Sequence, residues 1–338
     1  MMRIDKVEDQ IKKYQKYDIF AQNIPINLHK FEKVSSYEGT CLTFIFYILM
    51  ILFSFLNSPG DIFWRNNPTV SQSYMNQDNT HVINFGKNEF YFYFNLFYAN
   101  NSNLEEESYI YTRLRIKTVH HNETGKAPTM KYFDLNKCSE EDLADKPIEK
   151  KEKLIGKYLC PNFKDYVITG SSLEDFTNIG QVLVYPCYHN NTENKRKCKS
   201  KEEISKFIRE EKLKVSIVYP IPVVKILDLE KPMKRKMHED YFYLSGNLED
   251  YRFINYKFDK IQILTDTNIF FETTNEKFEY EMKLVSQDTR IIDKDDARIF
   301  SLDLKSSFLL NTYNRVYLKL FDCLSTIGGF YAILYMVF

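Results

Sequence analysis

The chain has 338 residues and carries 46 basic and 46 acidic side chains, so its formal net charge at pH 7 is zero. A neutral chain lacks the basic surface that binds phosphate backbones, which argues against nucleic acid as a partner. The ten glycines form no G-x-G-x-x-G or other phosphate-binding loop, which argues against a nucleotide-dependent enzyme.

The first predicted element is an apolar segment that follows a basic N-terminal stretch. Residues 39–60 carry no charge, and a bilayer core of about 30 Å needs roughly 20 helical residues to cross it. Residues 1–38 hold seven Lys and Arg, whereas the far flank holds only Arg65 before Lys87. By the positive-inside rule, we expect residues 1–38 to be a cytoplasmic segment and residues 39–60 to be transmembrane helix 1.

Residues 61–316 form the predicted extracytoplasmic domain, in which strand patterns predominate. From Ile110 to Val119, apolar and basic side chains alternate with the period of two that indicates a half-buried strand. The aromatic run 89–98 is expected to be a strand buried on both faces. Further strands are predicted at 166–169, 181–185, 214–219, 251–258, 261–264, 277–284 and 298–304. We expect a mainly β (α+β), sandwich-like domain, either single or divided into two lobes near 228–238.

Helical patterns are few in this domain. Ser139 and Ser200 each precede acidic residues in the arrangement of an N-capping box. The second box opens a short amphipathic helix with Ile204, Phe207 and Ile208 on one face.

The extracytoplasmic domain contains four cysteines, Cys138, Cys160, Cys187 and Cys198. An even number outside the cytosol predicts two disulfides, and proximity in the sequence favours Cys138–Cys160 with Cys187–Cys198 among the three possible connectivities. The alternative is a zinc site that includes Cys187, His189 and Cys198, but the paired C-x-x-C spacing of such sites is absent. We therefore expect no metal and no cofactor.

Three N-glycosylation sequons agree with this orientation. They begin at Asn100, Asn122 and Asn190, all in polar stretches between the two apolar segments. N-linked glycans are therefore expected on the domain.

No constellation of catalytic residues is visible, and we predict that the protein is not an enzyme. There is no G-x-S-x-G motif, and no pair of carboxylates is spaced as a general acid and base. Asp266, which follows Thr265, is interpreted as a β-turn residue, with a cation ligand as the alternative.

The second apolar segment, residues 317–338, is predicted to be transmembrane helix 2. Only 16 residues follow Asp322, the last charge, so we expect the helix to be truncated at its C-terminal end. Ser325 and Gly329 form a small-x-x-x-small pair. Together with Gly328, they predict close helix packing or, as an alternative, a pore lining.

Several short motifs follow one another along the chain. They are Tyr17-Asp18-Ile19-Phe20, Leu159-Cys160-Pro161, Ile168-Thr169-Gly170, the stretch from Cys187 to Ile204, Thr265-Asp266 with Phe270-Phe271, and Ile327-Gly328-Gly329. In the order of these motifs, the chain resembles a large ciliate family (Tetrahymena and Paramecium type) of transmembrane proteins with two terminal spans and a Cys-containing extracytoplasmic domain. Thr267 stands where that family usually has Gly.

The resemblance implies a topology and a lineage, and it implies no particular activity. Erv/ERGIC-type cargo receptors and DEG/ENaC-type channels share the plan of a β domain between two spans, which is an analogy of fold only.

The functional expectation is a non-enzymatic integral membrane protein whose glycosylated, disulfide-bonded ectodomain mediates protein–protein interaction within a membrane assembly. The expected partners are other membrane proteins and the lipid bilayer. The protein is expected to form an oligomer or to belong to a multi-subunit complex. The alternatives are an ion-channel subunit with the last helix lining the pore and an Erv/ERGIC-like cargo receptor. The N-terminus is expected in the cytosol and the central domain outside it, at a plasma or ciliary membrane in preference to the endoplasmic reticulum or Golgi.

Overall fold

The structure, a computed structural model, describes residues 22–23, 33–34, 37–57, 67–85, 90–98, 108–122, 126–133, 135–144, 148, 151–161, 166–171, 173–187, 198–244, 246, 249–292 and 297–337. The chain divides into two compact units. Unit 1 comprises Met1–Val70, Thr265–Asn275 and Arg315–Phe338, and unit 2 comprises Ser71–Leu264 and Glu276–Asn314.

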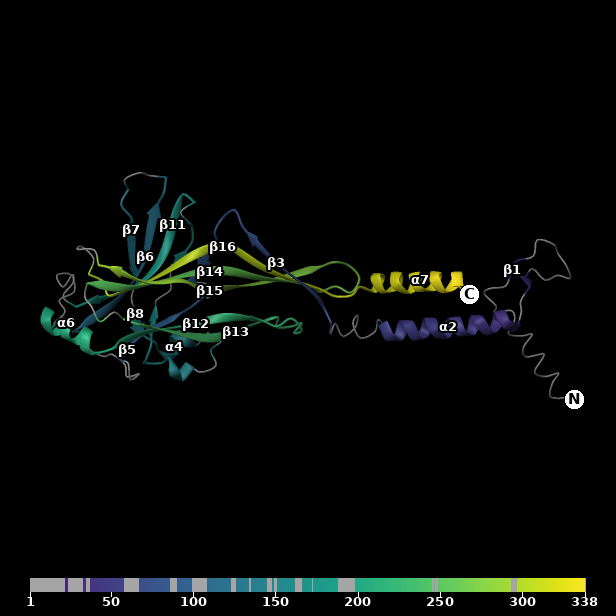
Figure 1. The fold of residues 1–338 in the computed structure, drawn as a ribbon, viewed down its shortest axis with the longest axis horizontal. Helices are drawn as coiled ribbons and strands as arrows, with labels where there is room; N and C mark the ends of the chain where they lie inside the picture. The colour runs from purple at the N-terminus through teal and green to yellow at the C-terminus, as the bar shows by residue number, and fades with distance from the viewer. Residues whose placement is uncertain are drawn as a thin grey trace. The chain divides into compact units, whose positions relative to one another are not determined.

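Strands dominate the described residues and form two principal sheets (Figure 1). The larger sheet has the order β15-β14-β16-β11-β6-β7, with β3 paired to β16, and the smaller has the order β13-β12-β5-β9-β8. The strands of the larger sheet are β3 (Thr69–Asn76), β6 (Ile110–His120), β7 (Thr129–Phe133), β11 (Phe176–Pro186), β14 (Asp250–Asp266), β15 (Thr274–Ile291) and β16 (Phe300–Val316). Those of the smaller sheet are β5 (Tyr93–Tyr98), β8 (Leu135–Lys137), β9 (Leu159–Pro161), β12 (Leu213–Val224) and β13 (Met233–Tyr243).

Two small strand pairs and the helices complete the described chain. Two small antiparallel pairs join β1 (Gln22–Asn23) to β2 (Lys33–Val34), and β4 (Ile83–Asn84) to β10 (Val167–Ile168). The helical elements are α2 (Tyr37–Asn57), α4 (Glu140–Leu143), the 3-10 turn η2 (Lys151–Lys153), α6 (Lys201–Glu210) and α7 (Leu320–Val337).

The core of unit 2 lies between the two sheets. In the larger sheet, Val182 is in register with Leu114 on one side and Leu302 on the other, and all three side chains are buried. In the smaller sheet, Val215 is in register with Leu96, and both belong to the same hydrophobic cluster as the first three. Alternate residues of each strand therefore face a shared apolar layer, which is the arrangement of a sandwich.

Strand β5 is buried on both faces, as its aromatic composition predicts. Phe94 and Leu96 belong to the core between the sheets, whereas Tyr93 and Phe97 belong to a second cluster on the opposite face. This second cluster is covered by the segment that runs through α4 and η2.

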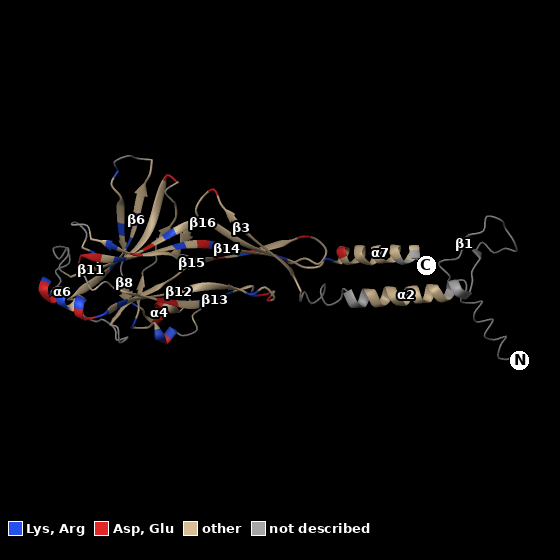
Figure 2. Cartoon of the chain, viewed as in Figure 1, with Lys and Arg blue, Asp and Glu red and all other residues tan. Residues whose placement is uncertain are grey.

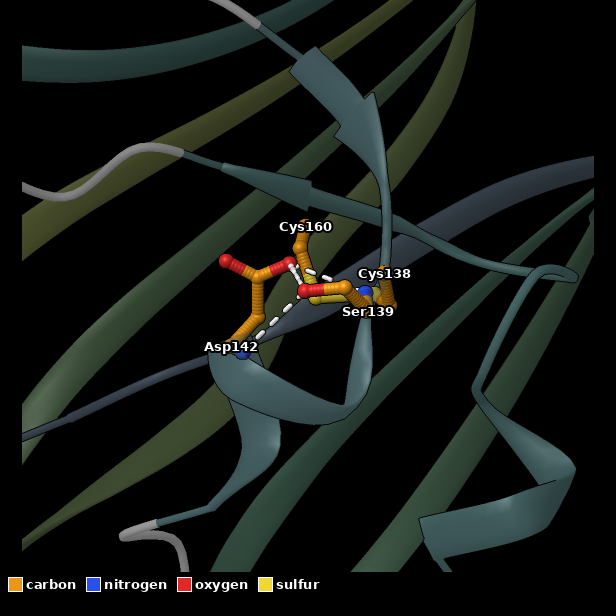
Figure 3. Close-up of a disulfide and its surroundings, with 4 residues drawn as sticks. All are labelled: Cys138, Ser139, Asp142 and Cys160. Carbon is orange, nitrogen blue, oxygen red and sulfur yellow. Dashed lines mark hydrogen bonds between the residues drawn. A yellow bond between two sulfur atoms is a disulfide. The ribbon is translucent and has the colours of Figure 1, made fainter.

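A disulfide holds this covering segment in place. Cys138 and Cys160 are bonded, with their Cα atoms 4.8 Å apart, and both are buried in the second cluster. Directly after Cys138, the hydroxyl of Ser139 accepts from the backbone N–H of Asp142, whose carboxylate in turn accepts from the Ser139 N–H and hydroxyl (Figure 3). The predicted capping box is therefore confirmed, and it fixes the turn next to the bridge.

The second predicted disulfide, Cys187–Cys198, is also present, with a Cα–Cα distance of 5.5 Å. It precedes α6, whose N-cap Ser200 exchanges the two predicted bonds with Glu203. Ile204 and Ile208 of α6 pack into the core of unit 2. The connectivity inferred from proximity is confirmed, and the predicted amphipathic helix places its apolar face on the sandwich.

The prediction of a two-span membrane protein is wrong. Within the part of the chain that the structure describes, no helix is both long and apolar enough to cross a membrane. The predicted spans relied on the uncharged run at 39–60 and on the apolar run at 317–338, whose last charge is Asp322. The helix α2 instead includes Glu38 and ends at Asn57, and α7 has 18 residues, with Asp322 in its first turn. At 1.5 Å per residue, α7 is about 27 Å long, which is shorter than a bilayer core.

In unit 1, α2 and α7 pack against each other through aromatic rings. The rings of Phe53 and Phe330 are stacked with their centroids 4.1 Å apart, and those of Phe46 and Tyr331 meet edge to face at 5.0 Å. The two cysteines of these helices, Cys41 and Cys323, are free.

Candidate functional site

The candidate site of unit 2 is a cleft beside the β12–β13 hairpin. We call it the hairpin cleft and define it by the hairpin residues Glu230–Met233 and the β15 residues Glu276–Glu279. It has a volume of about 330 Å³. Because β13 and β15 are the edge strands of different sheets, the cleft lies where the two layers of the sandwich open to solvent.

Local sequence explains the hairpin turn. The backbone N–H of Lys225 donates to the carbonyl of Pro232 at 2.7 Å, which closes the loop between the strands. Inside the loop, the carboxylate of Asp228 accepts from the backbone N–H of Lys231 at 2.8 Å, a bond that short acidic side chains favour in turns. Residues 228–238, where a break between lobes was one prediction, thus lie in this hairpin of unit 2.

A charged contact ties the two sheet edges together at the cleft. Arg235 on β13 donates from Nη2 to Oε2 of Glu279 on β15 at 2.6 Å and from Nε to the same oxygen at 2.9 Å. Burial opposes the charge of Arg235, but the adjacent Glu279 carboxylate raises the pKa of Arg235 above its ordinary value. The guanidinium also lies over the ring of Tyr91, 5.7 Å from its centroid. Nearby, Lys277 Nζ donates to the carbonyl of Glu230 at 2.9 Å, so both walls are held in place.

Apolar side chains are exposed in the hairpin loop, directly before the cleft residues in sequence, and in the cleft itself. Leu227, in the hairpin loop, is 71% exposed, and Ile226 and Leu229 on either side of it are 40% exposed. Phe278 lines the cleft from β15 and is exposed as well. Burying such side chains against a partner is favourable, at roughly 25 cal/mol per Å² of apolar surface removed from water. Contiguous exposed apolar groups with polar residues around them are typical of protein-binding surfaces.

The chemistry of the cleft is that of binding. Its carboxylates, including Glu230 and Glu276, alternate with the ammonium groups of Lys231 and Lys277, so neither sign of charge prevails. No nucleophile with an adjacent base lines it. In the described residues, no group of three His, Cys, Asp or Glu side chains is placed to hold a metal ion.

The predicted glycosylation sites are only partly within the described residues. Asn122 is exposed just after β6, and its side-chain amide donates to the carboxylate of Asp175. Asn100 and Asn190 lie outside the described residues, as does His189 of the alternative zinc site.

The two glycines of α7 face open space among the described residues. Ser325, Gly328 and Gly329 are exposed, and a Cβ added at either glycine would meet nothing within 4 Å. The ring contacts with α2 are made by Phe330 and Tyr331 instead. The two glycines therefore bring no helix into close approach among the described residues.

Asp266 lies in a turn, as the first interpretation of the sequence predicts. Its Oδ1 accepts from the backbone N–H groups of Asn268 and Thr273 at 3.4 and 3.3 Å, and its carboxylate pairs with Lys319. The acceptor atoms that a cation would need are thus already engaged.

Sequence reasoning missed the hairpin cleft because its two walls are far apart in the chain. One local sign was present: three large aliphatic residues, Ile226, Leu227 and Leu229, stand among charged residues in a stretch with turn-forming composition. Aliphatic side chains that occur within a turn have no strand face on which to be buried.

The comparisons with known proteins identify a family and no individual relative. A family model described as "Uncharacterised 80 kDa protein N-terminal domain" matches residues 94–307, which is well over half of the chain. No curated protein matches the sequence. A solved structure described as "Crystal Structure of Erv41p" aligns over 72% of this chain and 99% of its own, at 10% identity and a TM-score of 0.25. A likeness with so low a TM-score carries no argument.

Proposed function

The chain belongs to the family of the uncharacterised 80 kDa protein N-terminal domain, and we propose that unit 2 is a non-enzymatic domain that binds a partner protein at the hairpin cleft. Both walls of the cleft fall within the residues that the family model matches. The observation that carries the proposal is Leu227, a large apolar side chain exposed on a turn whose backbone is fixed by hydrogen bonds.

Preorganisation supports binding at this position. The Arg235–Glu279 pair and the Lys277–Glu230 contact already hold the two sheet edges in place in the free protein. Association therefore costs little conformational entropy at these edges. A partner would bury the aliphatic residues of the turn at the centre, and the surrounding Lys and Glu side chains would form the polar rim.

The compartment belongs to the proposal as well. Two disulfides are stable where thiols are oxidised, which favours a lumenal or extracellular location for unit 2. Glycosylation at the exposed Asn122 is part of the same proposal, because an attached glycan leaves one amide hydrogen that can still donate to Asp175. Neither the ion-channel nor the cargo-receptor alternative has a specific observation in its favour.

A photo-crosslinking experiment tests the proposal. The photoreactive residue p-benzoylphenylalanine would replace Leu227 in the full chain expressed in cells, and Leu173 would serve as the matched control. Leu173 is an apolar residue of unit 2, 85% exposed and outside both the cleft and the hairpin loop that carries Leu227. We expect a discrete adduct with one protein from position 227 and none from position 173.

The adduct is then checked with purified components. After mass spectrometry identifies the crosslinked protein, its dissociation constant should rise at least tenfold for Leu227→Glu and remain unchanged for Leu173→Glu. The proposal is wrong if position 227 gives no discrete adduct, or if both variants bind the identified protein equally well.

A further inference from the structure

Unit 1 exposes three phenylalanines at one position, where the turn between β14 and β15 meets the start of α7. We call residues 266–273 together with Phe321 the aromatic loop. Phe271 is 67% exposed, Phe321 55% and Phe270 50%. Their ring centroids lie 6.2–6.5 Å apart in all three pairings, so the rings form one cluster. Three exposed aromatic rings in contact are a large apolar surface for a single turn.

Buried charges fix the backbone beneath these rings. Lys319 Nζ donates to the carbonyl oxygens of Asn268 and Phe271 at 2.5 and 2.9 Å and pairs with the carboxylate of Asp266. The side chains of Lys319 and Asp266 are only 8% and 4% exposed. The backbone N–H of Phe270 donates to the side-chain oxygen of Asn268 at 2.9 Å. The ammonium group of Lys319 therefore lies buried beneath the aromatic loop, and the aromatic rings face outward.

The apolar surface continues from the loop onto a helix. The backbone N–H of Leu320, the first residue of α7, donates to the carbonyl of Ile269 at 3.1 Å. After Asp322, α7 carries no charged residue, and its ribbon in Figure 2 shows no blue or red beyond the first turn. Leu324, Ile333 and Met336 are exposed along it.

From this arrangement, we propose that the aromatic loop docks onto the surface of a zwitterionic lipid bilayer. Aromatic rings at a boundary between charged and uncharged surface suit the interface between lipid headgroups and acyl chains. Lys319 is buried and Glu272 is exposed, so the loop offers no cation to anionic headgroups. Docking at the surface requires neither α2 nor α7 to cross the bilayer.

A protein partner fits this surface less well. Protein interfaces carry roughly one hydrogen bond per 100–200 Å² and keep a polar rim. The three phenylalanine rings carry no donor, and on the adjoining helix the hydroxyl of Thr326 already donates to the carbonyl of Asp322 at 2.8 Å. A cluster of exposed rings without a donor is better matched by lipid.

Fluorescence quenching gives a direct test. The chain has one tryptophan, Trp64, which would be changed by Trp64→Phe so that a single new tryptophan reports on its own surroundings. Phe271→Trp places the reporter in the loop, and Phe278→Trp places a matched control at an exposed phenylalanine of unit 2. Both full-length proteins would be mixed with phosphatidylcholine vesicles, with and without bromine on the acyl chains.

For the Phe271→Trp variant, we expect a blue shift of the fluorescence and at least twofold quenching by brominated vesicles, with no change for the Phe278→Trp variant. Thiol titration of each variant checks that both disulfides have formed, so a folding failure is recognised. Quenching that is equal in the two variants would overturn the proposal. So would a blue shift of the Phe271→Trp variant that grows with protein concentration in the absence of vesicles, because that result would assign the loop to a second copy of the chain.

Discussion

Lys319 and Asp266 form a buried ion pair that connects the start of α7 to the turn between β14 and β15. Burial alone would raise the pKa of Asp266, but the hydrogen bond from Lys319 and those from the Thr273 and Asn268 amides lower it below its ordinary value. The pair therefore links the charge of one carboxylate to the conformation of the aromatic loop.

This lowered pKa predicts how the loop responds to acid. A carboxylate with a depressed pKa in the folded state contributes stability above its unfolded pKa of about 4, and the contribution is lost as pH falls through the folded value. We expect amide exchange protection at Phe270–Thr273 to be constant from pH 7 to pH 5 and to fall below pH 4. Asp266→Asn should remove this acid step. Loss of protection near neutral pH would contradict the assignment of this step to Asp266.

Removing one partner of the pair should be more damaging than removing both. Lys319→Met leaves the Asp266 carboxylate buried without its cation, which costs about 3–5 kcal/mol for buried pairs. The double variant Lys319→Met with Asp266→Leu should recover a large part of that loss. Denaturant unfolding of the two variants measures the difference. Equal unfolding free energies for the single and double variants would show that the pair is not coupled.

A second carboxylate joins the two sheets of unit 2. Asp240 on β13 accepts from the hydroxyl of Tyr219 at 2.7 Å and from that of Tyr256, on β14 of the opposite sheet, at 2.5 Å. Asp240→Ala leaves two buried hydroxyls without their acceptor, and we expect it to cost about 2–4 kcal/mol in urea unfolding. His238→Gln, which removes an exposed neighbour of the same carboxylate, should change the unfolding free energy by less than about 0.5 kcal/mol.

Strands, caps and disulfides could be predicted from the sequence because each depends on residues close together in the chain. The alternation from Ile110 to Val119 became β6, and the boxes at Ser139 and Ser200 became helix caps. Both disulfides join cysteines that are neighbours in sequence, with separations of 22 and 11 residues, so proximity sufficed for the connectivity.

Features built by distant segments could not be predicted. The alternation of β6 put Arg115 on its polar face, yet the structure buries this side chain, with Nε donating to Gln181 at 2.9 Å. Gln181 donates in turn to Asp303 at 2.8 Å. These partners lie on β11 and β16, and no local pattern encodes which strands become neighbours. The hairpin cleft escaped prediction for the same reason.

The hydrogen-bonded row Arg115–Gln181–Asp303, a polar ladder across β6, β11 and β16, gives a further prediction. Arg115→Met leaves the acceptor oxygen of buried Gln181 without its donor, and we expect a loss of about 2–3 kcal/mol in the free energy of unfolding. Lys117→Met is the matched control, since Lys117 is a half-buried basic residue two positions along the same strand. Its effect should stay below about 0.5 kcal/mol. Similar losses for the two variants would mean that the ladder contributes nothing specific.

The disulfides allow the sharpest chemical prediction. In the chain-entropy description, a bridge that closes a loop of 11–22 residues stabilises the fold by about 3 kcal/mol, slightly more for the longer loop. Cys138 and Cys160 are also both buried in the cluster that covers β5, whereas Cys198 of the other pair is only partly buried. We therefore expect the double change of this pair to Ser to lower the unfolding temperature more than the same change of Cys187 and Cys198. A chelator should change neither midpoint. If all four cysteines of the unreduced domain could be titrated as thiols, or if a chelator unfolded the domain, they would have to be assigned to a metal site instead of two disulfides.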